Sequence, residues 1–303
     1  MAFQTFLPAD VEAALGGRYT IDSKIDVGGQ GAVFRATRTA RPDGTAANDF
    51  VALKLHFDPR QAIRVEREVT ALEHLSHPNL ARLIEHGHCY VTGRKTQFIA
   101  YEFIEGQSLK QRLKNGGKLV EFEVLPIARD ISAAIAALWS HRIVHGDIKP
   151  SNIMLRDSGQ AVLIDLGVLR FFGEDGATRP LRPIGYFSPG NWGTVGYLSP
   201  EQARGEKLSC ASDIFSLGVV MVECLVGWHP TKGDQSALAN GIRASELRLD
   251  VSAGLLSVLE KMLLPVPRSR GKVTKLSSYF QALQQRMDGE FAKDTPASER
   301  AQG

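Results

Sequence analysis

Polar side chains that suit phosphate chemistry gather in one short stretch, HGDIKPSNIML, at residues 145–155. His145, Asp147, Lys149 and Asn152 supply these polar groups. Gly146, directly before Asp147, brings no side chain of its own. The stretch therefore indicates a phosphotransferase, and the other motifs must decide which kind.

Two segments upstream could also bind phosphate. The turn VGGQGAVF, residues 27–34, is rich in glycine, and missing side chains let backbone N–H groups approach phosphate oxygens. In VALK, residues 51–54, Lys54 ends an alternating strand and could reach both phosphates and a carboxylate on a helix. Each segment alone is weak evidence, because glycine-rich hairpins and solvated lysines at strand edges are common. Only their combination carries weight.

The motifs occur in a fixed order along the chain. After Lys54 come Glu68 on the next predicted helix, HGDIKPSN, then LIDLG at 163–167 and GTVGYLSPEQ at 193–202. This ordered set resembles the signature of protein kinases. From about Tyr19 to Leu283 the chain resembles a bacterial-type, Hanks-type (eukaryotic-like) serine/threonine protein kinase, with HGD in place of HRD and DLG in place of DFG.

Hydrophobic periodicity agrees with this resemblance. Residues 19–55 alternate like antiparallel strands joined by short loops, and two more strand-like segments follow at 80–104. Apolar residues change to helical spacing at 60–75, and the later helical segments lie at 121–141, 212–227 and 254–264.

The resemblance implies an α+β, bilobal protein-kinase-like fold. We expect a short leader at 1–18, a small β-rich N-lobe with one regulatory helix at 19–103, and a larger, mainly helical C-lobe at 104–285. The polar residues 286–303 are expected to be a disordered tail.

The resemblance also assigns the catalytic roles. Lys54 would hold the α- and β-phosphates of ATP and pair with Glu68, for which Glu66 is the rival candidate. Asp147 would orient the substrate hydroxyl and accept its proton, and Lys149 would neutralise the γ-phosphate. Thr194 would contact both of them.

The cofactors implied are ATP and Mg²⁺, with Mn²⁺ as an alternative ion. The metal ligands would be Asn152 and Asp165. The nucleotide would lie among a larger set of side chains and backbone groups: Asp26, Val27, Gly28, Gly29, Gln30, Gly31, Val33, Ala52, Lys54, Tyr101, Glu102, Ile104 and Met154. Tyr101 would be the gatekeeper, and Glu102 to Ile104 would bond the base through the backbone.

Two further polar residues have structural roles in the family. Glu201 is expected to form an ion pair with Arg270 in the larger lobe. Asp213 is expected to brace the backbone of the catalytic loop, and a simple helix N-cap is the other role expected, which is compatible with the first.

Several positions depart from the family pattern. Asp26 replaces a glycine and Gln30 an aromatic residue in the phosphate loop, so nucleotide binding should be weaker. Leu166 replaces phenylalanine at little cost. Gly146 replaces the arginine that clamps a phosphorylated activation segment, so we expect activity that does not depend on such a phosphate. A large loss at Thr178 or Ser188 that an acidic substitute restores would contradict this.

Composition limits the partners. In 303 residues, 36 basic and 33 acidic side chains leave a net charge of +3, too small to indicate nucleic acid. The longest apolar segment, 214–228, contains Glu223 and is too short to span a membrane. Three separated cysteines indicate a reducing cytoplasm. Protein substrates and a possible regulatory protein are the partners expected, and His86, His88 and Cys89 are interpreted as structural.

Two other functions fit part of the sequence. HGD also occurs in small-molecule phosphotransferases such as aminoglycoside kinases, but the segment between Asp165 and Glu201, with GTVGY and SPEQ, favours a protein substrate. A pseudokinase scaffold is supported only by Asp26 and Gln30. The sequence therefore predicts a serine/threonine protein kinase that can autophosphorylate.

Overall fold

The structure is a computed structural model that describes residues 6–28, 31–41, 43–56, 62–165, 170–171, 194–232 and 234–294. The chain divides into two compact units, of which the first ends at Glu105 and the second begins at Gly106. Asp165 groups with the first unit.

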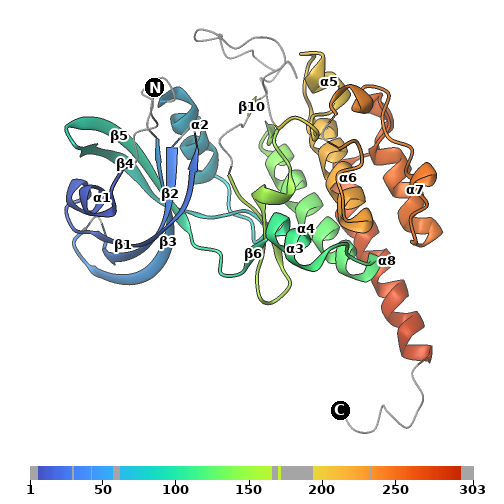
Figure 1. The fold of residues 1–303 in the computed structure, drawn as a ribbon, viewed down its shortest axis with the longest axis horizontal. Coiled ribbons are helices and arrows are strands. Elements are labelled where there is room, and N and C mark those ends of the chain that lie inside the picture. The colour runs from blue at the N-terminus through green and yellow to red at the C-terminus, as the bar shows by residue number, and fades with distance from the viewer. Residues whose placement is uncertain are drawn as a thin grey trace. The chain divides into compact units, whose positions relative to one another are not determined.

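The first unit contains a five-stranded antiparallel sheet with the strand order β1-β2-β3-β5-β4 (Figure 1). The helix α2, Ala62–Glu73, packs against β4 and β5. This is the predicted β-rich lobe with one helix. Its strands are β1 (Tyr19–Gly28), β2 (Gly31–Ala40), β3 (Ala46–His56), β4 (Leu83–Val91) and β5 (Arg94–Glu102).

Alternation along β2 and β3 places the two faces of the sheet in different surroundings. Phe34 and Leu53 are fully buried in the core of this unit. Their neighbours Val33, Ala52 and Lys54 point to the opposite face and are half-buried. The period of two in the sequence thus positions Lys54 on the same face as the predicted adenine contacts.

The leader packs on this unit. The helix α1, Pro8–Ala14, contacts β1 and β4, and Phe6, Val11 and Leu15 join the core beneath the sheet. The Glu12 carboxylate accepts a 2.6 Å hydrogen bond from the Ile21 N–H. Because these apolar side chains share a core with Phe34 and Leu53, α1 covers that face of the sheet.

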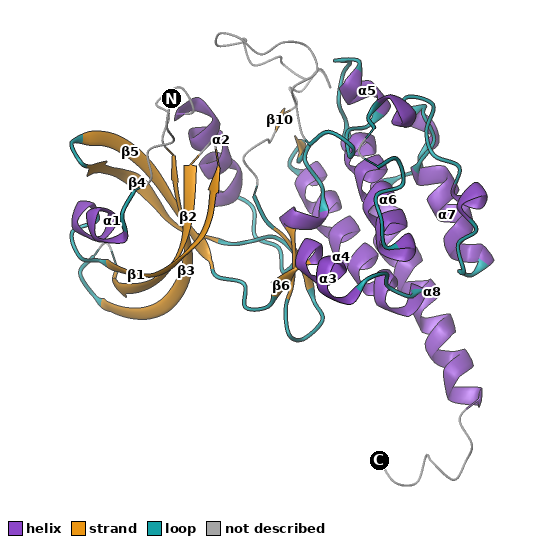
Figure 2. Cartoon of the chain, viewed as in Figure 1, coloured by secondary structure: helices purple, strands orange, loops and turns teal. Residues whose placement is uncertain are grey.

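The second unit is mainly helical (Figure 2). The helix α6 is buried along almost its whole length, and α4 packs against both α6 and α8. Its helices are α3 (Leu109–Gly116), α4 (Glu121–Ser140), α5 (Pro200–Ala203), α6 (Cys210–Val226), α7 (Ala253–Met262) and α8 (Val273–Asp294).

The segments between these helices contain short strands and 3-10 turns. Three strands form one small sheet, β6-β8-β9, and β7 pairs with β10. The strands are β6 (Gln107–Ser108), β7 (Ile143–Val144), β8 (Ile153–Leu155), β9 (Ala161–Leu163) and β10 (Arg170–Phe171). The 3-10 turns are η2 (Pro150–Asn152), η3 (Ser236–Leu238), η4 (Ala244–Leu247) and η5 (Pro267–Ser269).

The end of α8 corrects the expected tail. Residues 286–294 were predicted to be disordered, but the helix continues to Asp294. The reason is local: no proline interrupts the chain before Pro296, and most residues on the way favour helix. Residues 295–303 lie outside the described part of the chain. Among the helices described, none is both long and apolar enough to cross a lipid bilayer.

Candidate active site

Lys54 on β3 lies between two carboxylates of the first unit. Its Nζ is 2.7 Å from Asp165 Oδ1 and 3.7 Å from Glu68 Oε1. Glu68 lies on α2 with its side chain 1% exposed, whereas Glu66 faces solvent. The predicted pairing of Lys54 with Glu68 rather than Glu66 is confirmed. We call Lys54, Glu68, Asp165 and Tyr101 the lysine half-site.

Tyr101 on β5 completes the lysine half-site. Its hydroxyl donates a hydrogen bond to Glu68 Oε1, and its side chain is buried. Burial raises the pKa of Glu68, while the Lys54 charge and the Tyr101 hydroxyl oppose that rise. Burial and the Glu68 carboxylate also raise the pKa of Tyr101, so the phenol stays a donor.

Sequence reasoning assigned Tyr101 to the nucleotide and missed its bond to Glu68. A signal was present, since a tyrosine at an apolar position of a strand needs a partner for its hydroxyl. Tyr101 is paired across the sheet with both Ala52 and Leu83. Because β5 is an interior strand that packs against α2, a carboxylate on that helix is the partner within reach.

Asp165 adopts a left-handed backbone conformation, with φ at 60°. Asp is one of the few residues that tolerate this region, which is commonly found at functional sites. The side chain is 42% exposed although one oxygen contacts Lys54. Its carboxylate is thus accessible to a hard cation, which fits the ligand role expected of it.

The phosphate loop is described on both sides of its tip, and Gly29 and Gln30 lie outside the described residues. Gly28 pairs with Gly31 across the β1–β2 hairpin. A Cβ at Gly31 would meet the Leu55 carbonyl oxygen at 2.0 Å, so β3 itself requires glycine there. This glycine therefore has a packing reason as well as the predicted phosphate role.

Asp26 and Val27 precede that loop and are exposed. The Asp26 carboxylate accepts a 2.8 Å hydrogen bond from the Val27 N–H. One oxygen of Asp26 is therefore engaged locally with its own backbone, which lessens the charge it presents to a neighbouring phosphate.

The end of β5 supplies the backbone predicted to bond the base. The Glu102 N–H is already donated to the Arg82 carbonyl at 2.9 Å. Ile104 is buried, with 5% of its surface exposed. The hydrogen bonds expected from Glu102 to Ile104 therefore cannot use the Glu102 N–H.

In the second unit, Asp147 is the centre of a polar network. Thr194 donates to Asp147 Oδ1 at 2.8 Å, and Lys149 Nζ lies 2.7 Å from Oδ2. Lys149 Nζ also donates to the Thr194 hydroxyl at 2.6 Å. The three side chains predicted to meet are thus brought together, and we call them, with Asn152, the aspartate half-site.

Asn152 turns its amide toward the same loop. Its Nδ2 donates to the Asp147 carbonyl at 2.9 Å and lies 3.3 Å from Asp147 Oδ2. With the amino group fixed in this way, the Oδ1 atom is the part of the amide left for a cation. Met154, two residues further in β8, pairs with Val162 and is half-buried.

The backbone around Gly146 is held from two sides. The buried Asp213 accepts hydrogen bonds from the N–H groups of His145, at 2.9 Å, and Gly146, at 2.8 Å. Gln202 Nε2 donates to the Gly146 carbonyl at 2.9 Å. The predicted bracing role of Asp213 is confirmed, and its predicted role as an N-cap is wrong because α6 is capped by Ser209.

Gly146 itself has φ at 79°, a region that glycine enters freely and other residues rarely. The braced loop therefore has a conformational reason for glycine, in addition to the missing arginine side chain. Sequence reasoning found only the second reason, since φ cannot be seen in the residue type. It also missed Gln202.

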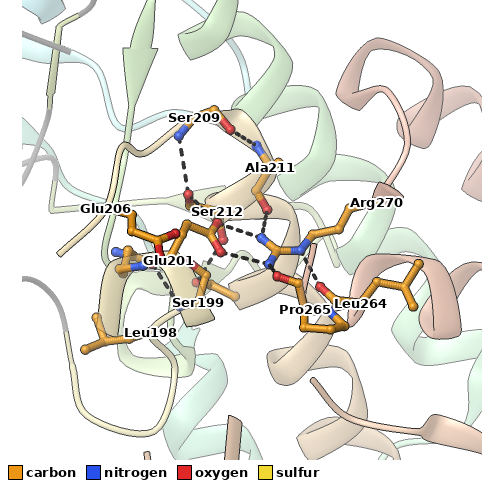
Figure 3. Close-up of polar contacts among 12 residues, drawn as sticks. Leu198, Ser199, Glu201, Glu206, Ser209, Ala211, Ser212, Leu264, Pro265 and Arg270 are labelled. Atoms are coloured by element: carbon orange, nitrogen blue, oxygen red, sulfur yellow. Dashed lines mark hydrogen bonds and ion pairs between the residues drawn. The ribbon is translucent and has the colours of Figure 1, made fainter. Parts of the chain in front are cut away.

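A buried ion pair underlies this region (Figure 3). Arg270 donates to both oxygens of Glu201, at 2.7 and 2.8 Å, as predicted. Burial alone would raise the pKa of Glu201, but the hydrogen bonds and charge of Arg270 override it and lower that pKa. Arg270 also donates to the Leu264, Pro265 and Ala211 carbonyls. The guanidinium is thus fully engaged.

Other predicted positions lie elsewhere. Leu166, Thr178 and Ser188 fall outside the described residues. His86 lies near Glu73, with 3.1 Å between His86 Nε2 and Glu73 Oε1. Across the ranges described, no group of three His, Cys, Asp or Glu side chains is arranged to hold a metal ion.

Comparison with known proteins agrees with these half-sites. Residues 19–280 match the model of the protein kinase domain. The chain belongs to the protein kinase domain family. Among curated proteins, a probable serine/threonine-protein kinase PknB of Lactococcus lactis is 32% identical over 75% of this chain and 34% of its own length.

Two further relatives are similar. A probable serine/threonine-protein kinase of Streptomyces coelicolor is 34% identical over 73% of this chain and 32% of its own. The serine/threonine-protein kinase PknA of Mycobacterium tuberculosis is 32% identical over 74% of this chain and 50% of its own. The chain thus spans only about a third to a half of the length of these relatives.

Proposed function

We propose that this chain is a serine/threonine protein kinase that transfers the γ-phosphate of ATP to a protein hydroxyl. The observation that carries the proposal is the contact of Thr194 with both Asp147 and Lys149. Thr194 belongs to the GTVGYLSPEQ segment that distinguishes protein kinases from small-molecule kinases. The names of the curated relatives support the same substrate class.

In this mechanism, Asp147 orients the substrate hydroxyl and accepts its proton. The hydroxyl oxygen bonds to the γ-phosphorus as the bond to the β–γ bridging oxygen breaks, and ADP leaves. Lys149 neutralises charge on the transferred group, and its 2.7 Å contact with Asp147 holds the two side chains together. Thr194 fixes the rotamer of both side chains.

The lysine half-site would bind the nucleotide. Lys54 would hold the α- and β-phosphates, with Glu68 and Tyr101 fixing its position. Val33, Ala52 and Met154 are the apolar contacts proposed for the base, and Ile104 offers backbone groups to it. We also propose that Asp26, where the family has glycine, weakens the binding of the phosphates.

The oxygen ligands Asp165 and Asn152 fit Mg²⁺ better than softer metals. When bound, the ion would neutralise charge on the phosphates and hold them in place for transfer. Mn²⁺, which prefers the same oxygen ligands, is an alternative.

We also propose that the protein works in a reducing cytoplasm. Cys89, Cys210 and Cys224 are all free thiols, and burial raises the pKa of Cys89 to about 11 and that of Cys210 to about 12. Such thiols are unreactive, in keeping with a reducing cytoplasm.

The test is the intact mass of the purified protein before and after incubation with ATP and Mg²⁺, with casein as a second acceptor. Mass steps of one phosphate on serine or threonine, absent in Asp165→Ala, are expected. The matched control is Asp157→Asn, which changes an exposed carboxylate in the turn between β8 and β9.

Two other outcomes would each reject the proposal. Transfer to kanamycin but to neither protein would favour a small-molecule phosphotransferase. Binding of ATP with no transfer to any acceptor would favour a pseudokinase scaffold.

A further inference from the structure

The segment 194–199 joins Thr194 to the cap of α5, and side chains from other elements bond the backbone of Gly196, Tyr197 and Leu198. The Tyr197 N–H bonds the Thr194 carbonyl at 3.0 Å, and the Ser199 N–H donates to Gln202 Oε1 of α5 at 3.0 Å. The contacts of the Gly196 backbone and of the Tyr197 and Leu198 carbonyls come from α6 and from the loop that follows it, residues 227–232 and 234–241. That loop has no part in the mechanism above.

Gln235 makes two of these contacts with one amide. Its Oε1 accepts a hydrogen bond from the Gly196 N–H at 2.9 Å, and its Nε2 donates to the Leu198 carbonyl at 2.9 Å. A donor faces an acceptor at both ends, so the amide orientation is unambiguous. Gln235 therefore bonds the segment as a neighbouring β-strand would.

His229 holds the remaining polar group of Gly196. Its Nε2 lies 2.9 Å from the Gly196 carbonyl, and its Nδ1 lies 3.3 Å from the Thr231 N–H. A carbonyl can only accept, so Nε2 carries the hydrogen and Nδ1 accepts. Both ring nitrogens are thus used by the neutral tautomer, which fixes the ring against the segment.

The side chain and carbonyl of Tyr197 are fixed in the same way. Its hydroxyl donates to Glu223 Oε2 at 2.6 Å, and its ring meets the His229 ring edge-on at 4.9 Å. Ser216 donates to the Tyr197 carbonyl at 2.7 Å. Both α6 and the following loop therefore hold Tyr197 in place.

The loop that presents Gln235 is itself rigidly built. Asp234 Oδ1 accepts from both the N–H and the hydroxyl of Ser236, at 2.9 and 2.7 Å. Leu238, at the end of η3, is fully buried and donates its N–H to the Gln235 carbonyl. A turn anchored by a buried leucine is a firm support for a side chain that positions another element.

We propose that Gln235 and His229 are positioning residues that hold the 194–199 segment where the Thr194 hydroxyl reaches Asp147 and Lys149. This inference rests on the proposed function and deepens it. With glycine at 146 no arginine beside Asp147 can bind an activation-segment phosphate, and the Gln235 and His229 contacts order the segment instead.

Steady-state kinetics of the full chain with casein and ATP test the proposal. Gln235→Ala should lower kcat by about 10- to 100-fold, because small displacements at a catalytic group cost this much. Gln235→Glu keeps the shape and the acceptor for Gly196 but loses the donor, so its loss should be smaller. The KM for ATP should stay within about twofold in both variants, since the nucleotide contacts are untouched.

The control is Gln285→Ala, an exposed glutamine on α8, which should match the wild type. A folded Gln235→Ala variant with a kcat within about twofold of the wild type would overturn the proposal. If the alanine variant does not fold, the same criterion is applied to Gln235→Glu: a kcat within about twofold of the wild type would overturn the proposal.

A double mutant separates positioning from general structural damage. If Gln235 acts through Thr194, Gln235→Ala combined with Thr194→Val should be no slower than Thr194→Val alone. Losses that multiply in the double mutant would show that Gln235 acts elsewhere and would contradict the proposal.

Hydrogen exchange gives a readout that needs no phosphoryl transfer. The Gly196 amide should exchange faster in Gln235→Ala than in the wild type, while amides within α6 keep their rates. Unchanged exchange at Gly196 would overturn the proposal. A wild-type protein that transfers no phosphate would reject the proposed function, and the exchange experiment would still decide whether Gln235 holds the segment.

Discussion

The two half-sites are held in different ways. In the lysine half-site, side chains hold one another: Lys54 contacts Asp165 and Glu68, and Tyr101 contacts Glu68. In the aspartate half-site side chains also bond one another, and in addition the backbone before Asp147 is held, because Asp213 accepts hydrogen bonds from two consecutive N–H groups. One arrangement depends on the protonation state of a carboxylate and the other on a network of several elements.

The number of donors separates the half-sites further. Thr194, Lys149 and Asn152 all lie within hydrogen-bonding reach of the Asp147 carboxylate. Glu68 has the Tyr101 hydroxyl and a lysine at 3.7 Å. The Asp147 carboxylate is therefore the more fully bonded of the two, and the raised pKa of Glu68 makes the lysine half-site the one expected to respond to pH.

The largest effect should come from the centre of the aspartate half-site. Asp147→Asn keeps the shape but loses the proton acceptor, so kcat should fall by about 10²- to 10⁴-fold with little change in the KM for ATP. Steady-state kinetics measure this, with Asp157→Asn as control. A kcat loss of less than about tenfold would mean that Asp147 is not the base.

The largest effect on stability should come from the buried ion pair between Arg270 and Glu201. Arg270→Leu leaves the buried Glu201 carboxylate unpaired, which should lower the free energy of unfolding by about 3–5 kcal/mol. Urea unfolding measures this. Arg243→Ala removes a side chain that is 79% exposed and should change the value by less than about 0.5 kcal/mol. Equal effects of the two substitutions would refute the assigned role.

The lysine half-site should respond to pH. Activity needs ionised Glu68, and burial raises its pKa above the ordinary 4.5, so activity should fall on the acid side earlier than for an exposed carboxylate. The Tyr101 hydroxyl lowers that pKa. Tyr101→Phe should therefore move the acid limb of kcat/KM to higher pH and lower activity at neutral pH by about three- to tenfold.

Tyr90→Phe, at a residue 65% exposed, is the control and should leave the profile unchanged. An acid limb that stays in place in Tyr101→Phe would show that Glu68 does not depend on this hydroxyl.

The smallest effect concerns Gly146. Its φ of 79° should make Gly146→Ala less stable by about 1–2 kcal/mol. Gly44→Ala is the matched control, because Gly44 has φ at 82° in a turn with no neighbour for the added Cβ. Similar losses of stability are expected, with a loss of kcat only at Gly146. No stability loss at either position would contradict the conformational argument.

Much of this arrangement could be predicted from sequence. Alternation predicted the strand that Lys54 ends, because a period of two is a direct property of a strand. The resemblance to protein kinases predicted Val33 and Ala52 as contacts of the base. Helical spacing located α2, α4, α6 and α7 within a few residues. Motif order then assigned Asp147, Lys149 and Thr194 to one site.

What sequence could not give was long-range hydrogen bonding. The partners of Gln202 and Gln235 lie in distant segments, and nothing in a glutamine's neighbours shows which carbonyl it will meet. The positive φ of Gly146 could not be predicted from sequence either, because this backbone is held by a hydrogen bond to the distant residue Asp213. The helical residues 286–294 were not predicted because their polar composition is typical of a disordered tail, whereas no proline interrupts the helix before Pro296.

The central claim is that the aspartate half-site is assembled without a phosphate on the activation segment. The most direct measurement is the initial rate of casein phosphorylation by phosphatase-treated protein, followed from the moment ATP is added. The account predicts full rate with no lag, unchanged in Thr178→Val and Ser188→Ala. A lag that disappears after preincubation with ATP, together with a loss in either variant that an acidic residue restores, would contradict it.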